Sequence, residues 1–351
     1  MTSGSPARPL GRPRARLLLV VLAAVVVAVV VGVTLLRPGV EPSTATALDL
    51  SGDLAAHDPA LVVGHDGAPW YVFSTGVEGE SGGAPQIRTS PDGRAWTRAG
   101  AVWDAAHAPA WVADLVPGVR AYWAPDVIEH DGVYYLYWAA STFGSNTSVI
   151  GLHTNTTLDP TDPDYAWVDR GPVIASASGD DLNAIDPGVV VDDDGTPWMA
   201  FGSFWSGIRM VELSWPSGLR ADPSAEPLRL ADRGSPPDAI EAATVVHHDG
   251  WYYLFVSLDS CCRGVASTYR IAVGRSAAVT GPYVDRGSTP LLEGGGTVLL
   301  DSDGFMVGPG GESASEGYLA FHYYDASKGG AFQLAVRQLG WRDGWPVLTT
   351  S

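Results

Sequence analysis

The feature that most constrains the fold of this chain is one turn motif that recurs along it. In each copy an acidic residue and a Gly precede an aromatic, apolar run, as in "DGVYYLYWAAS". There are five copies, whose acidic residues are numbers 66, 131, 194, 249 and 316, so their starts lie 65, 63, 55 and 67 residues apart. An acidic residue and Gly between two apolar runs indicate a β-hairpin. A recurrence at such regular spacing predicts similar units in series.

Units of this length have room for four short strands each, which predicts an all-β fold, a five-bladed β-propeller. A two-sheet sandwich is the competing all-β class, but it does not require five near-equal units. Links rich in Gly, Pro, Ser and Asp separate the units, and no long amphipathic helix is predicted beyond residue 47. Four tyrosines at strand positions are expected to pack between blades: Tyr134, Tyr135, Tyr252 and Tyr253.

The first 47 residues are predicted to lie outside the propeller. Arginines at 8, 12, 14 and 16 precede an uncharged apolar run of twenty residues, 17–36, and "ATA" at 45–47 suits cleavage after Ala47. This pattern is typical of an export signal peptide. Twenty apolar residues can also span a bilayer, so an uncleaved signal anchor is the alternative. Both interpretations place residues 48–351 outside the cytoplasm, either secreted or anchored to the outer face of the cytoplasmic membrane.

The charge of the chain excludes some partners. Its formal net charge is −18, five of its arginines lie in the leader, and Lys328 is its only lysine. A propeller with this much negative charge repels nucleic acid and anionic lipid. Contact with a membrane is therefore expected only through an uncleaved N-terminal segment. A monomer is expected.

The two cysteines are adjacent, Cys261 and Cys262, so they cannot form a long-range disulfide framework. A vicinal disulfide and two buried thiols both remain open. No Cys and His spacing resembles a zinc site, and the residues predict no metal ligand set.

Acidic residues recur at the start of the predicted inner strands. Asp58, Asp186 and Glu241 each lie eight residues before the acidic residue of a turn, and Asp126 lies five before. Because equivalent positions of propeller blades converge on the central channel, several carboxylates are predicted to share one cavity. Like charges brought together raise one another's pKa and cost stability unless chemistry or a ligand uses them. Two carboxylates about 6.5 to 9.5 Å apart, one protonated and one ionised, are what inverting glycoside hydrolysis needs.

Three further aromatic residues lie in the links beside these acids. They are Trp123 in "YWAPD", Phe143 in "STFGSN" and Trp205 in "FGSFWSG". Flat rings at such positions are predicted to stack on sugar faces.

Several stretches together resemble the family 43 glycoside hydrolases, and within them the endo-α-1,5-L-arabinanases. The stretches are "HDP" at 57–59, "WAPDV" at 123–127, "NAIDP" at 183–187, "FGSFWSGI" at 201–208, "IEA" at 240–242 and "CCRGVASTYRI" at 261–271. The resemblance extends from about residue 50 to 325. It implies a five-bladed propeller that acts as an inverting arabinan endo-1,5-α-L-arabinosidase on arabinan or arabino-oligosaccharides.

The resemblance also implies roles for single residues. Asp58 would be the general base, Glu241 the general acid, and Asp186 the residue that orients the acid and keeps its pKa high. Asp126 matches a supporting acid of the family. The implied sugar contacts are Gly144, Asn183, Ala184, Ile185, Asp186, Ser203, Phe204 and Trp205.

One position departs from the family pattern. Arabinanases usually read "GPGHNS" in the fifth blade, with the His near a metal ion or its waters on the propeller axis, whereas this chain reads "GPGGES" at 308–313. Gly311 has no imidazole to offer. No cofactor is expected to be required, and a structural calcium ion is in doubt unless Glu312 or another residue takes that place.

Two other functions compete with an endo-acting hydrolase. One is an exo-acting α-L-arabinofuranosidase or β-xylosidase of the same family, which would need a pocket closed at one end. The other is a non-catalytic arabinan-binding propeller that has lost turnover with the fifth-blade His. The presence of Asp58, Asp186 and Glu241 argues against the second.

Overall fold

The structure is a computed structural model, and it describes residues 1–2 and 47–348. Residues 47–348 belong to one compact unit. Within the described part of the chain, no helix is long and apolar enough to cross a membrane. The predicted leader, including the apolar run 17–36, lies almost wholly outside the described residues.

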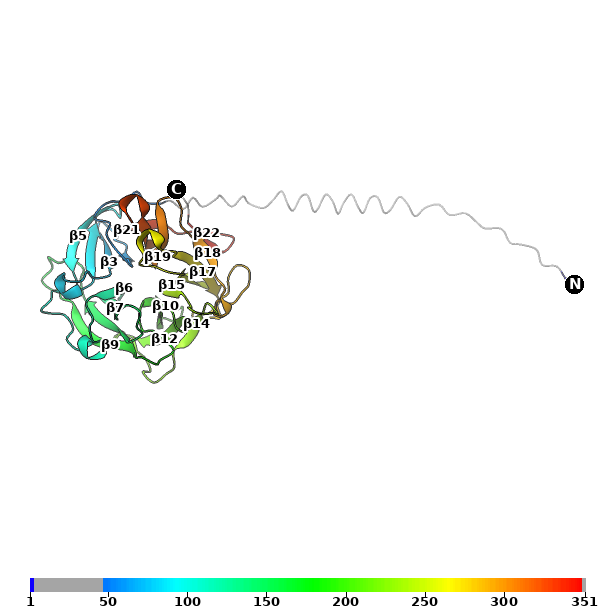
Figure 1. Ribbon diagram of the computed structural model, residues 1–351, viewed down its shortest axis with the longest axis horizontal. Helices are drawn as coiled ribbons and strands as arrows, with labels where there is room; N and C mark the ends of the chain where they lie inside the picture. The colour runs from blue at the N-terminus through cyan, green and yellow to red at the C-terminus, as the bar shows by residue number, and fades with distance from the viewer. Residues whose placement is uncertain (3–46, 349–351) are drawn as a thin grey trace. The chain divides into compact units, whose positions relative to one another are not determined.

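The propeller is confirmed. Five sheets surround a central axis, and the strand before the recurring turn of each sheet lies nearest the axis (Figure 1). These inner strands of neighbouring blades contact one another around the ring. Within the blades strands pair antiparallel, except that β1 pairs parallel with β5.

The strands follow the chain from blade to blade. Blade one has β1 (Ser51–Gly52), β2 (Ala60–Val62), β3 (Trp70–Ser74), β4 (Gln86–Ser90) and β5 (Ala95–Ala101). Blade two has β6 (Tyr122–His130), β7 (Val133–Ala140), β8 (Ser148–Asn155) and β9 (Val168–Ser176). Blade three has β10 (Gly188–Val191), β11 (Pro197–Phe201), β12 (Ile208–Ser214), β13 (Leu219–Arg220) and β14 (Leu228–Ala231).

Blade four has β15 (Ile240–His248), β16 (Trp251–Leu258), β17 (Arg270–Ser276) and β18 (Thr297–Leu300). Blade five has β19 (Met306–Ser315), β20 (Tyr318–Asp325) and β21 (Ala331–Gln338), and a ribbon of β22 (Gly340–Arg342) and β23 (Trp345–Val347) follows. Helical structure among the described residues is short: α2 (Val112–Leu115) and 3-10 turns at Ser81–Gly83, Gly264–Ala266, Leu291–Glu293 and Ala326–Lys328.

The recurring turns join each inner strand to the next strand of its blade. In four of the five, both turn residues have positive φ, for example 50° at Asp131 and 75° at Gly132. A type I′ hairpin requires this backbone, and an acidic residue followed by Gly tolerates it. In blade three only Gly195 of the pair has positive φ, at 82°.

The second strand of a blade is buried on both faces, which explains its unbroken apolar run. Along β7, Tyr135 and Tyr137 pack toward blade three, whereas Leu136 and Trp138 pack toward blade one. Alternate residues of a strand point to opposite faces, so each run contributes to two interfaces. The described residues form five such apolar clusters, one between each pair of adjacent blades. Tyr252 packs between blades three and four and Tyr253 between blades four and five, as predicted for blade packing.

Blade five differs from the predicted four strands. It has three, and the beginning of the propeller chain completes it, because the Leu48 N–H donates to the Val336 carbonyl at 3.1 Å and Ala47 bridges to Arg337 in β21. The Leu334 N–H donates to the Leu54 carbonyl at 2.7 Å. These bonds join the first and last segments of the propeller, so the ring closes on itself.

Candidate active site

Each blade contributes one residue with a left-handed backbone to the wall of the axial cavity, either just before its inner strand or within it. These residues are Asp58, Ala124, Asp186, Ala242 and Gly311, with φ between 40° and 61°. The cavity is lined by these segments of all five blades. Because the five positions are equivalent, the cavity wall repeats with the blades.

Three of the predicted carboxylates, Asp58, Asp126 and Asp186, line this cavity together. Glu241 lies one residue before the left-handed position of its blade, so its spacing of eight residues does not make it the exact counterpart of Asp58 and Asp186. The electrostatic interaction of Glu241 with both of those residues shows that it still belongs to the cluster.

Hydrogen bonds run around the axis from each blade to the one before it. In every case a backbone N–H of an inner strand, or of the residues leading into it, donates to a side chain of the preceding blade. The pairs are Ala124 with Thr75 Oγ1 (2.9 Å), Val189 with Asp126 Oδ2 (2.7 Å), Ala242 with Asp186 Oδ2 (3.2 Å), Gly311 with Ser257 Oγ (2.9 Å) and Asp58 with His322 Nδ1 (3.1 Å). These side chains are therefore held in fixed positions while they satisfy buried backbone donors.

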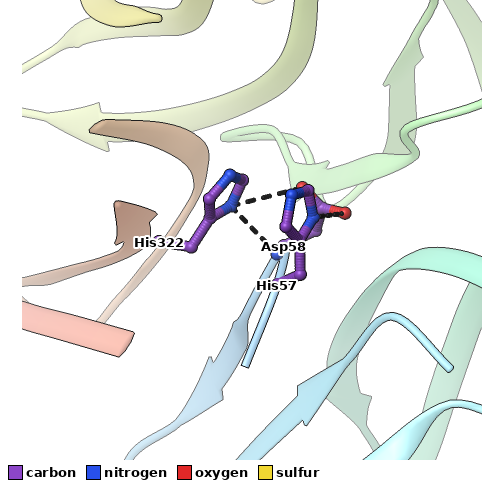
Figure 2. A group of neighbouring side chains, drawn as sticks. All are labelled: His57, Asp58 and His322. Carbon is purple, nitrogen blue, oxygen red and sulfur yellow. Dashed lines mark hydrogen bonds and ion pairs between the residues drawn. The ribbon is translucent and has the colours of Figure 1, made fainter. Parts of the chain in front are cut away.

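Asp58 has two unequal carboxylate oxygens. Its Oδ2 accepts from the Thr75 hydroxyl at 2.7 Å and lies 2.7 Å from His57 Nδ1 (Figure 2). Its Oδ1 has no hydrogen bond within the described residues and lies 3.5 Å from His322 Nδ1, a nitrogen that already accepts the Asp58 N–H. Burial alone would raise the pKa of Asp58, but His57, His322 and Thr75 outweigh it and hold this pKa well below its usual range. Asp58 is thus ionised.

Glu241 is in the opposite state. Its side chain is buried, and its Oε2 accepts from the Ser203 hydroxyl. Burial raises the pKa of Glu241 to about 7, with a further contribution from the negative charge of Asp58. The pKa of Asp186 is also well above its usual value, because of burial and then because of Glu241 and Asp58. One site therefore holds an ionised carboxylate beside carboxyl groups whose pKa values are raised.

Two more acids complete the cluster. Burial raises the pKa of Asp126 to about 6, even though the Val189 N–H stabilises its charged form. Glu312 lies in the cavity wall of blade five, and burial raises its pKa to about 8. One Glu312 oxygen accepts from Ser257 at 2.6 Å, and the other has no partner within the described residues.

The loop after β11 presents two of the predicted sugar contacts. Phe204 and Trp205 both have left-handed backbones, with φ of 54° and 44°. The Phe204 N–H donates to the Ile240 carbonyl at 3.0 Å, which places Ser203 beside Glu241. Trp205 is 40% exposed. Consecutive left-handed residues other than Gly are strained, and such strain is found mainly at functional sites.

The remaining aromatic candidates differ in exposure. Phe143 is 84% exposed next to the exposed Gly144, in the loop between β7 and β8. Trp123 is half-buried in β6. Of these three aromatic candidates, Phe143 and Trp205 therefore have rings that are open to a ligand.

The "NAID" segment contributes less than expected. The side chains of Ala184 and Ile185 are buried in the apolar cluster between blades two and three, and Asn183 is buried with its Oδ1 accepting from Ser148 at 2.7 Å. A segment that leads into an inner strand must fill the space between blades, which turns these side chains away from a ligand. Only Asp186 of this segment reaches the axial cavity with its side chain.

Several residues of the site were not predicted. Thr75, Ser257, His322 and Tyr324 hold the carboxylates or their partners from the runs that follow the recurring turns, whereas His57 lies in the "HDP" stretch. The Asp58 and His322 partners are 264 residues apart in the chain. No local pattern could have paired them.

The cysteines form a vicinal disulfide, which decides between the two states left open by the sequence. The Cys262 N–H donates to the Tyr324 hydroxyl oxygen at 2.8 Å. The disulfide therefore lies at the edge of the site.

Another imidazole lies beside position 311, where the family pattern has a His. A Cβ placed on Gly311 would lie 2.7 Å from the His322 ring, so an imidazole from β20 occupies the space beside Gly311. His57, Asp58 and His322 each offer an atom within 4.8 Å of the others. Two imidazoles and one carboxylate do not suit calcium, which takes six to eight oxygens, and both His57 nitrogens are already hydrogen-bonded. This cluster does not fit a calcium ion.

Comparison with known proteins identifies the family. The model of glycosyl hydrolases family 43 matches residues 52–346. The chain belongs to this family. It is 40% identical to the extracellular endo-α-(1→5)-L-arabinanase 1 of Bacillus subtilis over 89% of this chain and 93% of the relative. It is 37% identical to an extracellular exo-α-(1→5)-L-arabinofuranosidase of Cellvibrio japonicus over 83% of this chain and 85% of that one.

Solved structures of arabinanases also resemble this chain. The endo-arabinanase of Bacillus licheniformis matches with a TM-score of 0.79 and 40% identity, over 86% of this chain and 99% of that chain. An exo-1,5-α-L-arabinanase from a bovine ruminal metagenomic library matches with a TM-score of 0.78 and 39% identity, over 86% of this chain and 99% of that chain. The family 43 chain described here is accordingly a glycoside hydrolase.

Proposed function

We propose that this glycoside hydrolase cuts α-1,5-L-arabinofuranosidic linkages inside arabinan, with inversion at the anomeric carbon. The observation that carries the proposal is the pair of opposite proton states in one axial site: Asp58 is ionised, whereas the pKa of Glu241 is about 7. An inverting glycosidase needs this combination, because one carboxylate activates water while the other carboxyl group protonates the leaving oxygen.

Asp58 suits the role of general base. Its Oδ2 holds two hydrogen bonds, from His57 and Thr75, which leaves Oδ1 to accept a proton from water. The water oxygen bonds to the anomeric carbon as the glycosidic bond breaks, and the water proton passes to Oδ1.

Glu241 suits the role of general acid. It transfers its proton to the departing sugar oxygen, so that charge is balanced by the end of the step. Burial and the charge of Asp58 keep the pKa of Glu241 high before substrate arrives, and the electrostatic interaction of Glu241 with the buried Asp186 places these two acids in one cluster. Asp186 is thus proposed to orient the acid, with Asp126 in a supporting role.

The names of the relatives support arabinan as the substrate. The Bacillus subtilis relative is named an endo-α-(1→5)-L-arabinanase and the Cellvibrio japonicus relative an exo-α-(1→5)-L-arabinofuranosidase, and both are named extracellular. The exposed rings of Phe143 and Trp205 are proposed to stack on sugar faces of the polymer. Export through the N-terminal leader, followed by secretion, agrees with the names of these relatives.

Exo action is the second candidate, since an exo-acting relative shares 37% identity with this chain. Early products separate the two. An endo-acting enzyme should release a ladder of oligosaccharides from debranched arabinan, whereas an exo-acting enzyme should release one short product from the first minute.

The catalytic assignment is tested with two substitutions and two substrates. Glu241→Gln should cripple hydrolysis of arabinan far more than that of an aryl arabinoside, whose leaving group needs little protonation. Asp58→Asn should cripple both alike, because the water loses its base, typically by about 10²- to 10⁴-fold. NMR of the first-formed product reports the stereochemistry. A retained anomer, or equal losses for Glu241→Gln on both substrates, would show that the roles are wrong.

A further inference from the structure

A chain of hydrogen bonds leads from Asp58 to the disulfide at the edge of the site. His57 Nδ1 lies 2.7 Å from Asp58 Oδ2, and His57 Nε2 lies 2.9 Å from the Tyr324 hydroxyl. The Tyr324 oxygen in turn accepts the Cys262 N–H at 2.8 Å. Tyr324 is buried in β20, whereas Cys262 is exposed.

The proton positions along this chain follow from what each group can do. An ionised carboxylate only accepts, so His57 must present Nδ1–H to Asp58. A neutral His57 then has its lone pair on Nε2, and the Tyr324 O–H must donate to it. This direction suits Tyr324, because its oxygen already accepts from Cys262, and burial raises the pKa of the phenol and keeps it protonated.

The Tyr324 oxygen is itself held in place from outside the axial cavity. The Cys262 N–H that donates to it belongs to a segment with its own internal hydrogen bond, from the Arg263 N–H to the Ser267 hydroxyl at 3.0 Å. The covalent bond between Cys261 and Cys262 restricts the backbone that carries the Cys262 N–H. The segment 261–267 therefore holds the donor that orients the phenol oxygen.

We propose that Tyr324, held by the disulfide-bonded segment, is a positioning residue for the general base. By donating to His57 Nε2 it selects the Nδ1–H tautomer, which aims a donor at Asp58 Oδ2 and leaves Oδ1 facing the attacking water. The proposal rests on the function proposed above, in which Asp58 is the base. Tyr324 itself is not assigned a contact with the substrate.

The test compares Tyr324→Phe with Tyr323→Phe. Tyr323 is the neighbouring residue of the same strand, and it packs partly buried against the apolar cluster between blades four and five. Tyr324→Phe should lower kcat by about tenfold, the rate equivalent of one hydrogen bond, with little change in KM. The acidic limb of the pH profile of kcat/KM for Tyr324→Phe should move to higher pH, because Asp58 loses its fixed His57 donor. The other titratable groups around Asp58 are unchanged in this variant: Glu241, Asp186, Glu312 and His322. Tyr323→Phe should keep the wild-type profile.

Asp58→Asn measured in parallel separates the two proposals. Near-complete loss in Asp58→Asn with an unmoved profile in Tyr324→Phe overturns the positioning role alone. Retained activity in Asp58→Asn overturns the assignment of the base, and the positioning role with it. ¹⁵N NMR of histidine-labelled wild-type protein needs no variant to fold. It should show His57 protonated at Nδ1 and unprotonated at Nε2, and the reverse tautomer would refute the proposal.

Discussion

His322 offers a sharp test of the axial hydrogen bonds, because it alone joins blade five to the N–H of Asp58. Its ring is fully buried, stacks on His57 with centroids 3.7 Å apart, and accepts the Asp58 N–H at 3.1 Å. His322→Ala leaves that N–H without an acceptor, which costs about 1–3 kcal/mol, and the lost ring volume adds roughly 2 kcal/mol or more. The His322 Nε2 has no partner within the described residues, so its removal offsets part of this cost.

His322→Asn separates the acceptor from the ring. The Asn amide oxygen can take the place of Nδ1, whereas both variants lose the ring. The two should therefore differ by about 1–3 kcal/mol in the free energy of unfolding, which is roughly 2–6 °C in Tm for a domain of this size. The kcat of His322→Asn should also exceed that of His322→Ala, because the left-handed backbone of Asp58 keeps its partner.

The assay is thermal unfolding together with initial rates on debranched arabinan. His248→Ala is the control, since it removes a half-exposed imidazole stacked on Trp341 at the other end of an inner strand. Its kcat should be unchanged. Equal Tm and equal kcat in the Asn and Ala variants of His322 would refute the acceptor role.

Three further predictions concern pH, metal and the leader. Glu241 acts as an acid only when protonated and its pKa is about 7, so kcat/KM should fall as pH rises through about 7. Toward acid kcat/KM should stay flat, because the low pKa of Asp58 keeps the base ionised. A profile whose acidic limb lies near pH 5 would contradict this. Since the cluster beside Gly311 does not fit calcium, EDTA should change kcat by less than about twofold, against the roughly 10- to 100-fold typical of a disturbed metal site. Elemental analysis that shows a stoichiometric metal, with activity abolished by the chelator, would overturn this prediction. A chain that begins at Leu48 should fold and cut arabinan, because the Leu48 N–H still reaches Val336; insoluble or inactive protein would place the domain boundary elsewhere.

The sequence predicted the fold because the fold is repeated. One turn motif marked all five hairpins, because an acidic residue followed by Gly tolerates the left-handed backbone that both turn residues adopt in four of them and that Gly195 alone adopts in blade three. The apolar run after it marked the strands that are buried on both faces. The fourth strand of blade five was not predicted, because it comes from the opposite end of the propeller chain. Local pattern carries no information about which distant segment completes a sheet.

The site was predictable where it follows the repeat and hidden where it does not. Asp58, Asp126 and Asp186 were found by their place before the turns, because the fold brings those places together. His322 was missed as a site residue, since its place depends on packing across blades rather than on spacing, and Glu312 was named only as a replacement for the missing His. The side chains of Ala184 and Ile185 fill the core, so the sugar contact that the resemblance implies for them stays a prediction.

The same backbone positions close the ring and carry the proposed chemistry, and this explains how the propeller tolerates so many acids on its axis. Asp126 and Asp186 each accept an N–H from the next blade, so each satisfies a buried donor that would otherwise cost stability. Electrostatic repulsion is limited because burial raises the pKa of Glu241 to about 7, that of Glu312 to about 8 and that of Asp186 well above its usual value, while Asp58 is stabilised as an ion by His57 and Thr75. Burial is the main cause that leaves Glu241 with a proton to donate, and the negative charge of Asp58 adds to it.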